Sequence, residues 1–156
     1  MLNKDRLRVL EIYRMGIETG NATFETKVPT WKQWNSNHLS HSRLVYESNK
    51  KILGWAALSP VSERKIYKGV AEISIYVDVN FLGQKIGFKL MNELIKSSEK
   101  YGIWTLTSSV FPENQATFKL HKNAGFRIVG VREKIAAHYG NWRNTLIFER
   151  RSQKKF

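Results

Sequence analysis

The sequence predicts one mixed α/β domain that spans residues 1–156. A chain of this length normally forms a single core, and no internal repeat or linker divides it. Short segments rich in β-branched and aromatic residues indicate strands, and longer segments with apolar residues three and four positions apart indicate amphipathic helices. The early strands form a hairpin and the later ones alternate with helices. We therefore expect at least one parallel strand pair joined by a right-handed crossover.

The first element is predicted to be a helix over residues 5–18. Leu7 and Ile17 fall among its apolar positions, Asp5 suits the N-cap, and Gly20 follows its end. Because such a helix is amphipathic, one of its faces should cover a sheet.

The next segment contains a loop, a short helix and a hairpin. NATFE (21–25) is expected to be a loop, and PTWKQW (29–34) suits a short helix that holds two tryptophans. Residues 43–48 and 51–59 flank an Asn-Lys pair and are predicted to form a β-hairpin.

The strongest strand signal is VAEISIYV (70–77). Alternation places Ala71, Ile73, Ile75 and Val77 on one face and Glu72, Ser74 and Tyr76 on the other. The later elements are a helix over 84–101, a strand over 103–110, a helix from about Asn114 to Gly125, and strands over 126–133 and 144–150.

The composition limits the possible functions. There is no cysteine, which excludes disulfides, cysteine-based zinc sites and a cysteine nucleophile. The formal charge is +13, from 26 Lys and Arg against 13 Asp and Glu, which favours anionic ligands. The basic residues are spread along the chain without a nucleic-acid-binding motif, so a lysine-rich solvated surface is the simpler interpretation. No signal peptide or membrane-spanning run is recognisable, and a cytoplasmic protein with neither nucleic-acid nor membrane partners is expected.

Glu72 is the first candidate for chemistry. Strands disfavour a carboxylate, and burial would raise its pKa toward the range useful for a general base. The alternative is that this face of the strand is simply exposed to water.

The loop at residues 82–87 is the second candidate. It joins a strand to a helix whose first N–H groups could bind a phosphate, and Lys85 could add a positive charge. Gly83 and Gly87 permit close approach, but the loop matches neither common phosphate-binding motif. Taken alone it is better explained as a helix start.

Histidines provide the remaining candidates. His121 lies on the helix that starts near Asn114 and could exchange a proton near pH 7. A lone helical histidine is more often a packing residue. His38 and His41 have no other metal ligand nearby in the sequence and are interpreted as structural.

The order of these segments resembles a known family. NATFE (21–25), GWAALSP (54–60), AEISIYV (71–77), PENQATFKLHKNAGF (112–126) and GVREKIAAHYGNWRNTLIFERRS (130–152) are similar to GCN5-related N-acetyltransferases (GNAT), within them to the phosphinothricin and methionine sulfone acetyltransferase group. The resemblance implies a mixed, mostly antiparallel twisted sheet flanked by helices. It also implies a homodimer that transfers an acetyl group from acetyl-CoA, without a metal, to the primary amine of a small amino-acid-like substrate.

The resemblance assigns roles to individual residues. The residues implied to bind acetyl-CoA are Ile75, Tyr76, Val77, Gly83, Gln84, Lys85, Ile86, Gly87, Phe88 and Asn114. Those implied to bind the acceptor are Phe24, Glu25, Arg64, Lys65 and Tyr67. Glu72 takes the place of the general base, and His121 that of the acid that protonates the leaving thiolate.

The sequence departs from the family pattern at three places. Leu82 and Lys85 replace the usual first residue and middle glycine of the pyrophosphate loop. If position 85 needs a positive φ, a lysine there is strained; otherwise it adds a cation beside the phosphates. Ser62 stands where an arginine is common, so the contact to a substrate carboxylate is in question. The first strand of the family is short or missing.

Two other functions remain open on the sequence. The acceptor could be a protein N-terminus, a polyamine or an aminoglycoside, although the positive charge argues against cationic acceptors. A non-catalytic, basic nucleic-acid-binding module on the same fold is the alternative from another class, which salt-dependent RNA binding would reveal.

Overall fold

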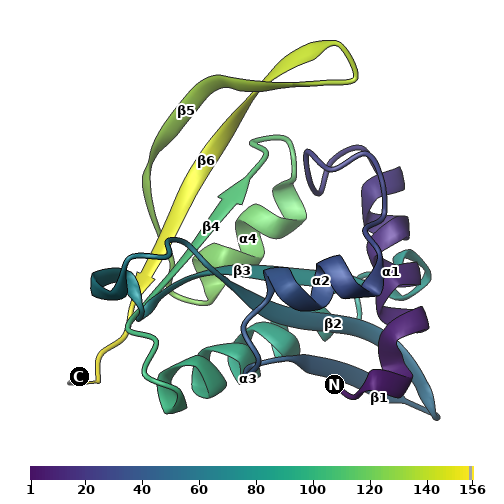
Figure 1. Ribbon diagram of the computed structural model, residues 1–156. Coiled ribbons are helices and arrows are strands. Elements are labelled where there is room, and N and C mark those ends of the chain that lie inside the picture. The colour runs from purple at the N-terminus through teal and green to yellow at the C-terminus, as the bar shows by residue number, and fades with distance from the viewer. Residues whose placement is uncertain (155) are drawn as a thin grey trace.

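The computed structural model describes residues 1–154 and Phe156 and contains one six-stranded sheet in the order β1-β2-β3-β4-β6-β5 (Figure 1). The strands are β1 (Leu44–Ser48), β2 (Lys51–Pro60), β3 (Val70–Val77), β4 (Thr105–Val110), β5 (Arg127–His138) and β6 (Asn141–Arg151). Only β3 and β4 pair in parallel, and the other four pairings are antiparallel. The predicted mixed, mostly antiparallel sheet is therefore confirmed.

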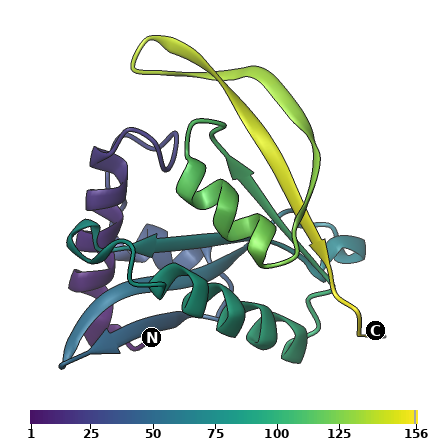
Figure 2. The ribbon, with the colours of Figure 1, turned by 180° about the vertical axis from the view of Figure 1, so that it is seen from behind.

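Helices cover both faces of this sheet. The α-helices are α1 (Arg6–Glu18), α2 (Trp31–Asn37), α3 (Ile86–Lys100) and α4 (Gln115–Asn123), and the 3-10 turns are η1 (Asn3–Asp5), η2 (Lys65–Tyr67) and η3 (Val79–Phe81). Helices α3 and α4 lie in front of the sheet in the reverse view, opposite to α1 and α2 (Figure 2). No strand precedes α1 in the described part of the chain, in agreement with the missing first strand.

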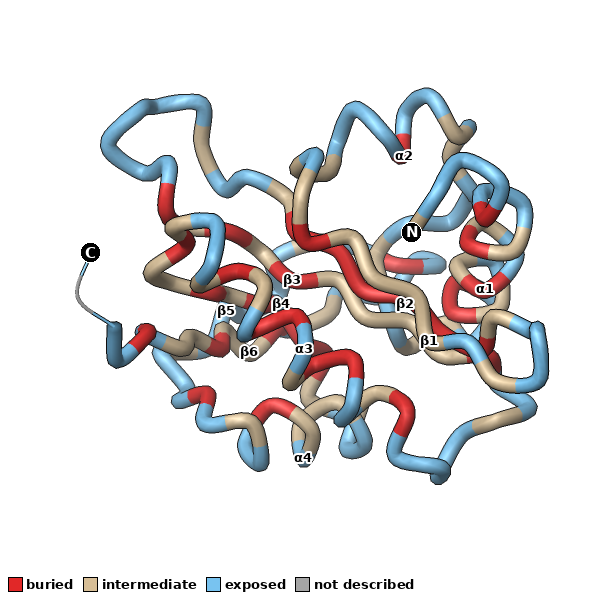
Figure 3. The backbone as a smooth tube through the Cα atoms, turned by 90° about the horizontal axis from the view of Figure 1, so that it is seen from below, coloured by how far each residue is buried: buried red, intermediate tan, exposed pale blue. Residues whose placement is uncertain are grey.

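Two apolar layers hold the helices to the sheet. On one side Leu90 and Leu94 belong to the buried face of α3, which packs against β1, β2 and β3. On the other, Trp34 of α2 and Val9 of α1 pack around Trp55 of β2, a side chain that is 1% exposed. The buried positions follow β2 through the centre of the molecule (Figure 3). Burial of each large side chain contributes roughly 2–3 kcal/mol, so β2 is the structural centre of the fold.

Local sequence explains most helix starts, with one qualification and one correction in α1. Thr30 caps α2: its hydroxyl accepts the Gln33 N–H at 3.3 Å, and the Gln33 side chain accepts the Thr30 N–H at 2.9 Å. Asp5 occupies the N-cap position of α1 as predicted, but its side chain makes no capping bond there and instead accepts the Leu2 N–H of the preceding 3-10 turn at 2.6 Å. Leu7, predicted to be a core position, is 75% exposed because the buried face of α1 carries Val9 and Ile12.

The C-terminal hairpin is longer than predicted. Strands β5 and β6 extend to His138 and from Asn141, beyond the predicted 126–133 and 144–150. The paired backbone continues across a register shift between Arg132 and Ala136, although the side chains there are mostly exposed. Backbone hydrogen bonding can maintain a hairpin whose side chains do not alternate between buried and exposed. The hydrophobic pattern of the sequence therefore did not predict the last residues of β5 or the first residues of β6.

The sheet opens between β3 and β4. Their parallel pairing covers only Val70–Glu72 against Thr105–Thr107 within the described residues. Beyond Glu72 the edge of β3 that faces β4 is therefore not covered by a neighbouring strand, and backbone groups there can pair with a ligand.

None of the helices in residues 1–154 is long and apolar enough to span a membrane.

Candidate active site

Two hollows meet at the open edge of β3. A groove of about 890 Å³ lies between α1, β3, α3 and α4, and a cavity of about 400 Å³ lies on the β4 and β6 side. We call them the cofactor groove and the acceptor cavity. The residues that line both are Asn21, Ala22, Ile75, Tyr76, Asn114, Thr117 and Leu120. A molecule in the groove can thus reach a molecule in the cavity across the middle of β3.

Nine of the ten residues predicted to bind the cofactor line the groove. They are Ile75, Tyr76, Val77, Gly83, Lys85, Ile86, Gly87, Phe88 and Asn114. Gln84 is exposed and is not among the lining residues. Asn114 is occupied at both ends of its amide: its oxygen accepts the Thr117 N–H at 3.1 Å, and its nitrogen donates to the Asn21 carbonyl at 2.9 Å. It therefore caps α4 and fixes the shared wall.

The loop before α3 has the geometry of an anion site. Gly83 has φ of +79°, and Lys85 has φ of 60° and ψ of 16°, a left-handed conformation that is unfavourable for a lysine. Lys85 occupies the N-cap of α3 without a capping bond from its side chain among the described atoms. The N–H groups of the first turn of α3 are consequently available for a phosphate.

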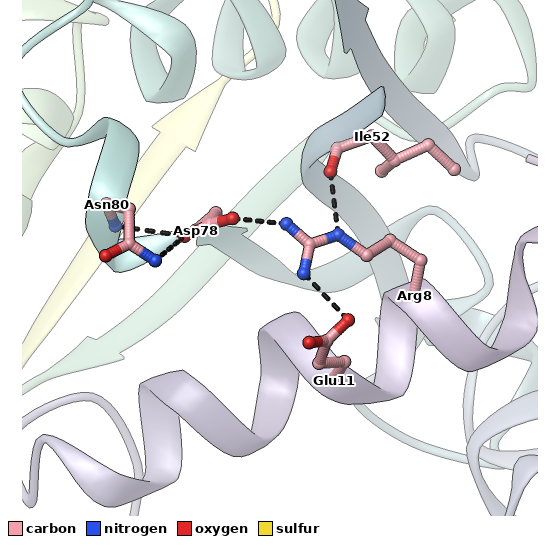
Figure 4. A network of polar contacts seen from close by, with 5 residues as sticks. All are labelled: Arg8, Glu11, Ile52, Asp78 and Asn80. Atoms are coloured by element: carbon pink, nitrogen blue, oxygen red, sulfur yellow. Dashed lines mark hydrogen bonds and ion pairs between the residues drawn. The ribbon is translucent and has the colours of Figure 1, made fainter. Parts of the chain in front are cut away.

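A buried ion pair fixes the entrance to this loop (Figure 4). Asp78 is fully buried at the end of β3, and its carboxylate accepts the backbone and side-chain N–H groups of Asn80, both at 2.9 Å. Arg8 of α1 donates to the same carboxylate, to the Ile52 carbonyl at 2.9 Å and to Glu11 at 2.8 Å. Burial by itself raises the pKa of Asp78, but the bonds from Asn80 and Arg8 outweigh it and lower that pKa below its ordinary value.

Glu72 lines the acceptor cavity, half-buried between β2 and β4. Burial raises the pKa of its carboxyl above the ordinary value, although hydrogen bonds from Ser109 and the charge of Arg132 partly oppose this. A carboxylate with a raised pKa at the bottom of a cavity has the properties of a general base.

His121 lines the same cavity and is only 3% exposed. Its Nδ1 lies 2.8 Å from the Thr117 carbonyl, which can only accept, so we assign the proton of the neutral ring to Nδ1. Burial lowers the pKa of His121, and the ring is neutral at pH 7. Nε2 has no partner within the described residues and is a hydrogen-bond acceptor in this tautomer.

Aromatic rings form the wall between the hollows. Tyr76 stacks on Trp55 at 4.9 Å and meets the edge of Tyr13 at 4.7 Å. Burial raises the pKa of Tyr76, so its hydroxyl remains protonated. A Cβ at Gly16 would lie 2.5 Å from the Tyr76 ring, and only glycine fits on α1 at this place.

Arg143 of β6 binds the loop at Gly20 and Asn21, part of which lines the acceptor cavity. Its guanidinium donates to the Gly20 carbonyl at 2.7 Å and to the Asn21 side chain at 2.9 Å, and it pairs with Glu113 at 3.0 Å. It also lies 3.6 Å from the centre of the Phe111 ring. Sequence reasoning did not assign this role, because the groups that Arg143 joins are far apart in the chain.

The predicted acceptor residues are only partly brought together. Phe24 and Glu25 line the acceptor cavity. The others, Arg64, Lys65 and Tyr67, are exposed at or beside η2 and do not line it. His38 does line the cavity, although the sequence indicated only a structural role; its ring stacks on Trp34 at 4.1 Å. The sequence also missed Tyr13, Ser109, Phe111 and Thr145 of the lining.

The fold and the two hollows are those of an acyl-transfer enzyme, and comparison with known proteins gives the family. Residues 9–126 match the Acetyltransferase (GNAT) family, and the chain belongs to that family. Among curated relatives, the phosphinothricin N-acetyltransferase of Alcaligenes faecalis is 29% identical over 149 residues, which cover 91% of this chain and 75% of that protein.

Solved structures show the same fold. The ribosomal-protein-alanine N-acetyltransferase of Brucella melitensis superposes with a TM-score of 0.91 at 25% identity, covering 97% of each chain. A GNAT superfamily phosphinothricin acetyltransferase (Pat) of Sinorhizobium meliloti, in complex with AcCoA, superposes with a TM-score of 0.87 at 23% identity, covering 97% of this chain and 85% of that one.

Proposed function

We propose that this protein transfers the acetyl group of acetyl-CoA to the primary amine of a small amino-acid-like substrate of the phosphinothricin or methionine sulfone type. One observation carries the proposal. The cofactor groove, which begins at an anion-binding loop, opens into a cavity that holds Glu72, and the two meet at Ile75 and Tyr76. A cofactor and an acceptor would therefore meet beside a general base.

The acetyl-CoA site follows from the groove. The pyrophosphate would lie against the first turn of α3, beside Lys85, where free N–H groups and the helix dipole favour an anion. The pantetheine arm would pair with the free edge of β3 at residues 75–77. The Sinorhizobium protein carries AcCoA on the same fold, which supports this assignment.

The chemistry needs a base, an oxyanion site and a proton for the leaving group. Glu72, directly or through a water, would take a proton from the ammonium of the acceptor. The amine nitrogen then attacks the thioester carbonyl carbon, and backbone N–H groups of residues 75–77 would stabilise the oxyanion. The carbon–sulfur bond breaks as the amide forms. The nitrogen loses a second proton as the tetrahedral intermediate collapses, and His121, neutral with Nε2 as an acceptor, would take this proton and pass it to the leaving thiolate.

The acceptor is inferred from the cavity and the relatives. About 400 Å³ suits a small molecule, and the curated relative is named for phosphinothricin. The Brucella structure is named for a protein N-terminal alanine, which makes a peptide amine the alternative acceptor. A cytoplasmic location accompanies the proposal, because acetyl-CoA is an intracellular metabolite.

Thiol release and calorimetry test the proposal together. We expect saturable binding of acetyl-CoA and release of CoA on addition of phosphinothricin or methionine sulfone. A peptide with an N-terminal alanine serves as the competing acceptor. Absence of acetyl-CoA binding at millimolar concentration would overturn the enzymatic function, whereas turnover with the peptide alone would change the acceptor class.

Lys85→Gly should separate the backbone effect of this position from its charge. Because φ is already positive in the free protein, glycine relieves strain in the folded state and should increase the free energy of unfolding by about 1 kcal/mol. The same change removes a cation, so acetyl-CoA affinity should fall about threefold, less at high salt. Lys85→Asn, which tolerates a left-handed backbone, is the matched control. Tighter binding by the glycine variant would contradict this.

We also propose that the protein is a homodimer joined through the β5–β6 hairpin. This hairpin extends beyond the rest of the molecule (Figure 1). It exposes a set of large apolar side chains: Val129, Val131, Ile135, Tyr139 and Trp142. Such a surface is unusual in a monomer and supports self-association.

Trp142→Lys tests this interface. Trp142 is 65% exposed, so the variant should fold, and its mass by light scattering should fall from dimer to monomer. Leu7→Lys, at an apolar position on α1 that is 75% exposed, should leave the mass unchanged. A monomeric wild type, or a dimer that survives the change at Trp142, would exclude the hairpin as the interface.

A further inference from the structure

The acceptor cavity does not itself contain a cation. Of the described residues that line it, Glu25 and Glu72 are carboxylates and none is a lysine or an arginine. Two acids suit the ammonium of an amino acid. Its carboxylate, in contrast, would be desolvated beside like charges unless a cation stands at the mouth of the cavity.

Strand register places Arg132 on the side of the sheet that bears Glu72. Arg132 of β5 is paired with Thr145 of β6, and directly opposed residues of an antiparallel pair project from the same face. Ile147 lies two residues after Thr145 on β6, and it is paired with Ser109 of β4. Ser109 lies two residues after Thr107, the partner of Glu72 on β4, and lines the acceptor cavity together with Glu72. Glu72 itself is paired with Thr107, whose row continues through Glu149 to Arg127, and the row of Thr145 and Arg132 lies farther along the same face of the sheet.

The charge of Arg132 is not neutralised within the described residues. Three other arginines of the sheet form ion pairs: Arg127 with Glu149, Arg143 with Glu113 and Arg150 with Glu99. No ion pair or hydrogen bond of the Arg132 side chain occurs between described residues, and the residue is exposed. The positive charge of Arg132 nevertheless acts on the cavity, since it opposes the rise in the pKa of Glu72 that burial causes.

Thr145 provides a second polar group on the same row. Its side chain lines the acceptor cavity and is 3% exposed, and its Oγ1 has no hydrogen-bond partner within the described residues. A buried hydroxyl without a partner is costly, and a ligand oxygen in the cavity would satisfy it.

We propose that Arg132 binds the carboxylate of the acceptor at the mouth of the cavity. The Thr145 hydroxyl donates a hydrogen bond to the same carboxylate. Together the two residues select amino acids over simple amines. This inference rests on the proposed acetyltransferase function. It assigns the carboxylate contact to Arg132, which does not line the cavity but is paired with the lining residue Thr145, instead of to Arg64 and Lys65 at η2, or to Ser62, which has no charge. The orientation brings the α-amine, one carbon from the carboxylate, toward Glu72.

The test compares an acid with its uncharged analogue. L-methionine sulfone and its carboxamide are acetylated by wild type, Arg132→Gln and Arg127→Gln, and KM and kcat are measured for each. Arg132→Gln should raise KM for the acid about tenfold, with little change in kcat, and leave KM for the carboxamide unchanged, because only the acid loses a charge-assisted contact. Arg127→Gln removes an equal charge from the same strand and should behave as wild type.

Two further readouts distinguish binding from a structural role. Arg132→Lys should recover part of the preference for the acid. Loss of the positive charge should also move the acidic limb of kcat/KM to higher pH, because Glu72 loses an interaction that lowers its pKa.

The failures are distinguishable. Equal KM values for acid and carboxamide in the wild type, or an equal effect of Arg132→Gln on both, would overturn the role of Arg132 and leave the acetyltransferase function standing. Absence of both acetyl-CoA binding and acetylation of any amine would overturn the proposed function and this inference with it.

Discussion

Glu72→Gln is expected to lower kcat for acetyl transfer about a thousandfold while leaving acetyl-CoA affinity unchanged. The amide keeps the size of the side chain and can accept a hydrogen bond from Ser109, but it cannot take a proton from the ammonium of the acceptor. Steady-state kinetics with the best acceptor, together with calorimetry for acetyl-CoA, measure the two quantities separately.

The pH dependence of kcat/KM tests the same assignment of Glu72 as the base. Because burial raises the pKa of Glu72, wild-type kcat/KM should fall with decreasing pH through a pKa above the ordinary glutamate value of about 4.3. The residual activity of the variant should lack this limb. Ser109→Ala is the matched control: it removes one hydrogen bond that lowers the pKa and should shift the limb upward without abolishing activity. Full activity of Glu72→Gln at all pH values would exclude the base assignment.

Asp78→Ala is expected to have the largest effect on stability. Removal of the carboxylate leaves the guanidinium of Arg8, 17% exposed, without its buried partner, and the free energy of unfolding should decrease by about 3 kcal/mol. Asn80 also loses the acceptor for two hydrogen bonds, so η3 and the following loop should be less well fixed. Acetyl-CoA affinity should therefore decrease as well.

A double-mutant cycle in urea checks this ion pair. Arg8→Met with Asp78→Leu removes both charges and should be more stable than either single change. The pKa of Asp78 is lowered in the folded state, so its contribution is present above the ordinary aspartate pKa of about 3.9 and is lost as pH falls through the folded value. Wild-type stability should thus decline more steeply below about pH 4 than that of Asp78→Asn. Additive single and double changes would refute the coupling.

The sequence by itself determined the elements and the polarity of their faces. The spacing of apolar residues predicted a helix over 84–101, close to the observed α3, and the alternation of VAEISIYV predicted that Glu72 and Ser74 share a face of β3. The segment PTWKQW, which contains Thr30, predicted the start of α2. These predictions succeeded because periodicity, capping and propensity act over a few neighbouring residues, and the family resemblance supplied the mixed, mostly antiparallel sheet.

Only the tertiary structure decided what surrounds Glu72. The cavity that it shares with Ser109 and its electrostatic interaction with Arg132 depend on the order β3-β4-β6-β5, which joins segments far apart in the chain. The pairing of Arg8 with Asp78 and the left-handed backbone of Lys85 are likewise set by packing against neighbouring elements, which overrides local preference. Local forces select helices and strands, whereas the environment of each charge is set by long-range strand pairing that no short stretch of sequence encodes.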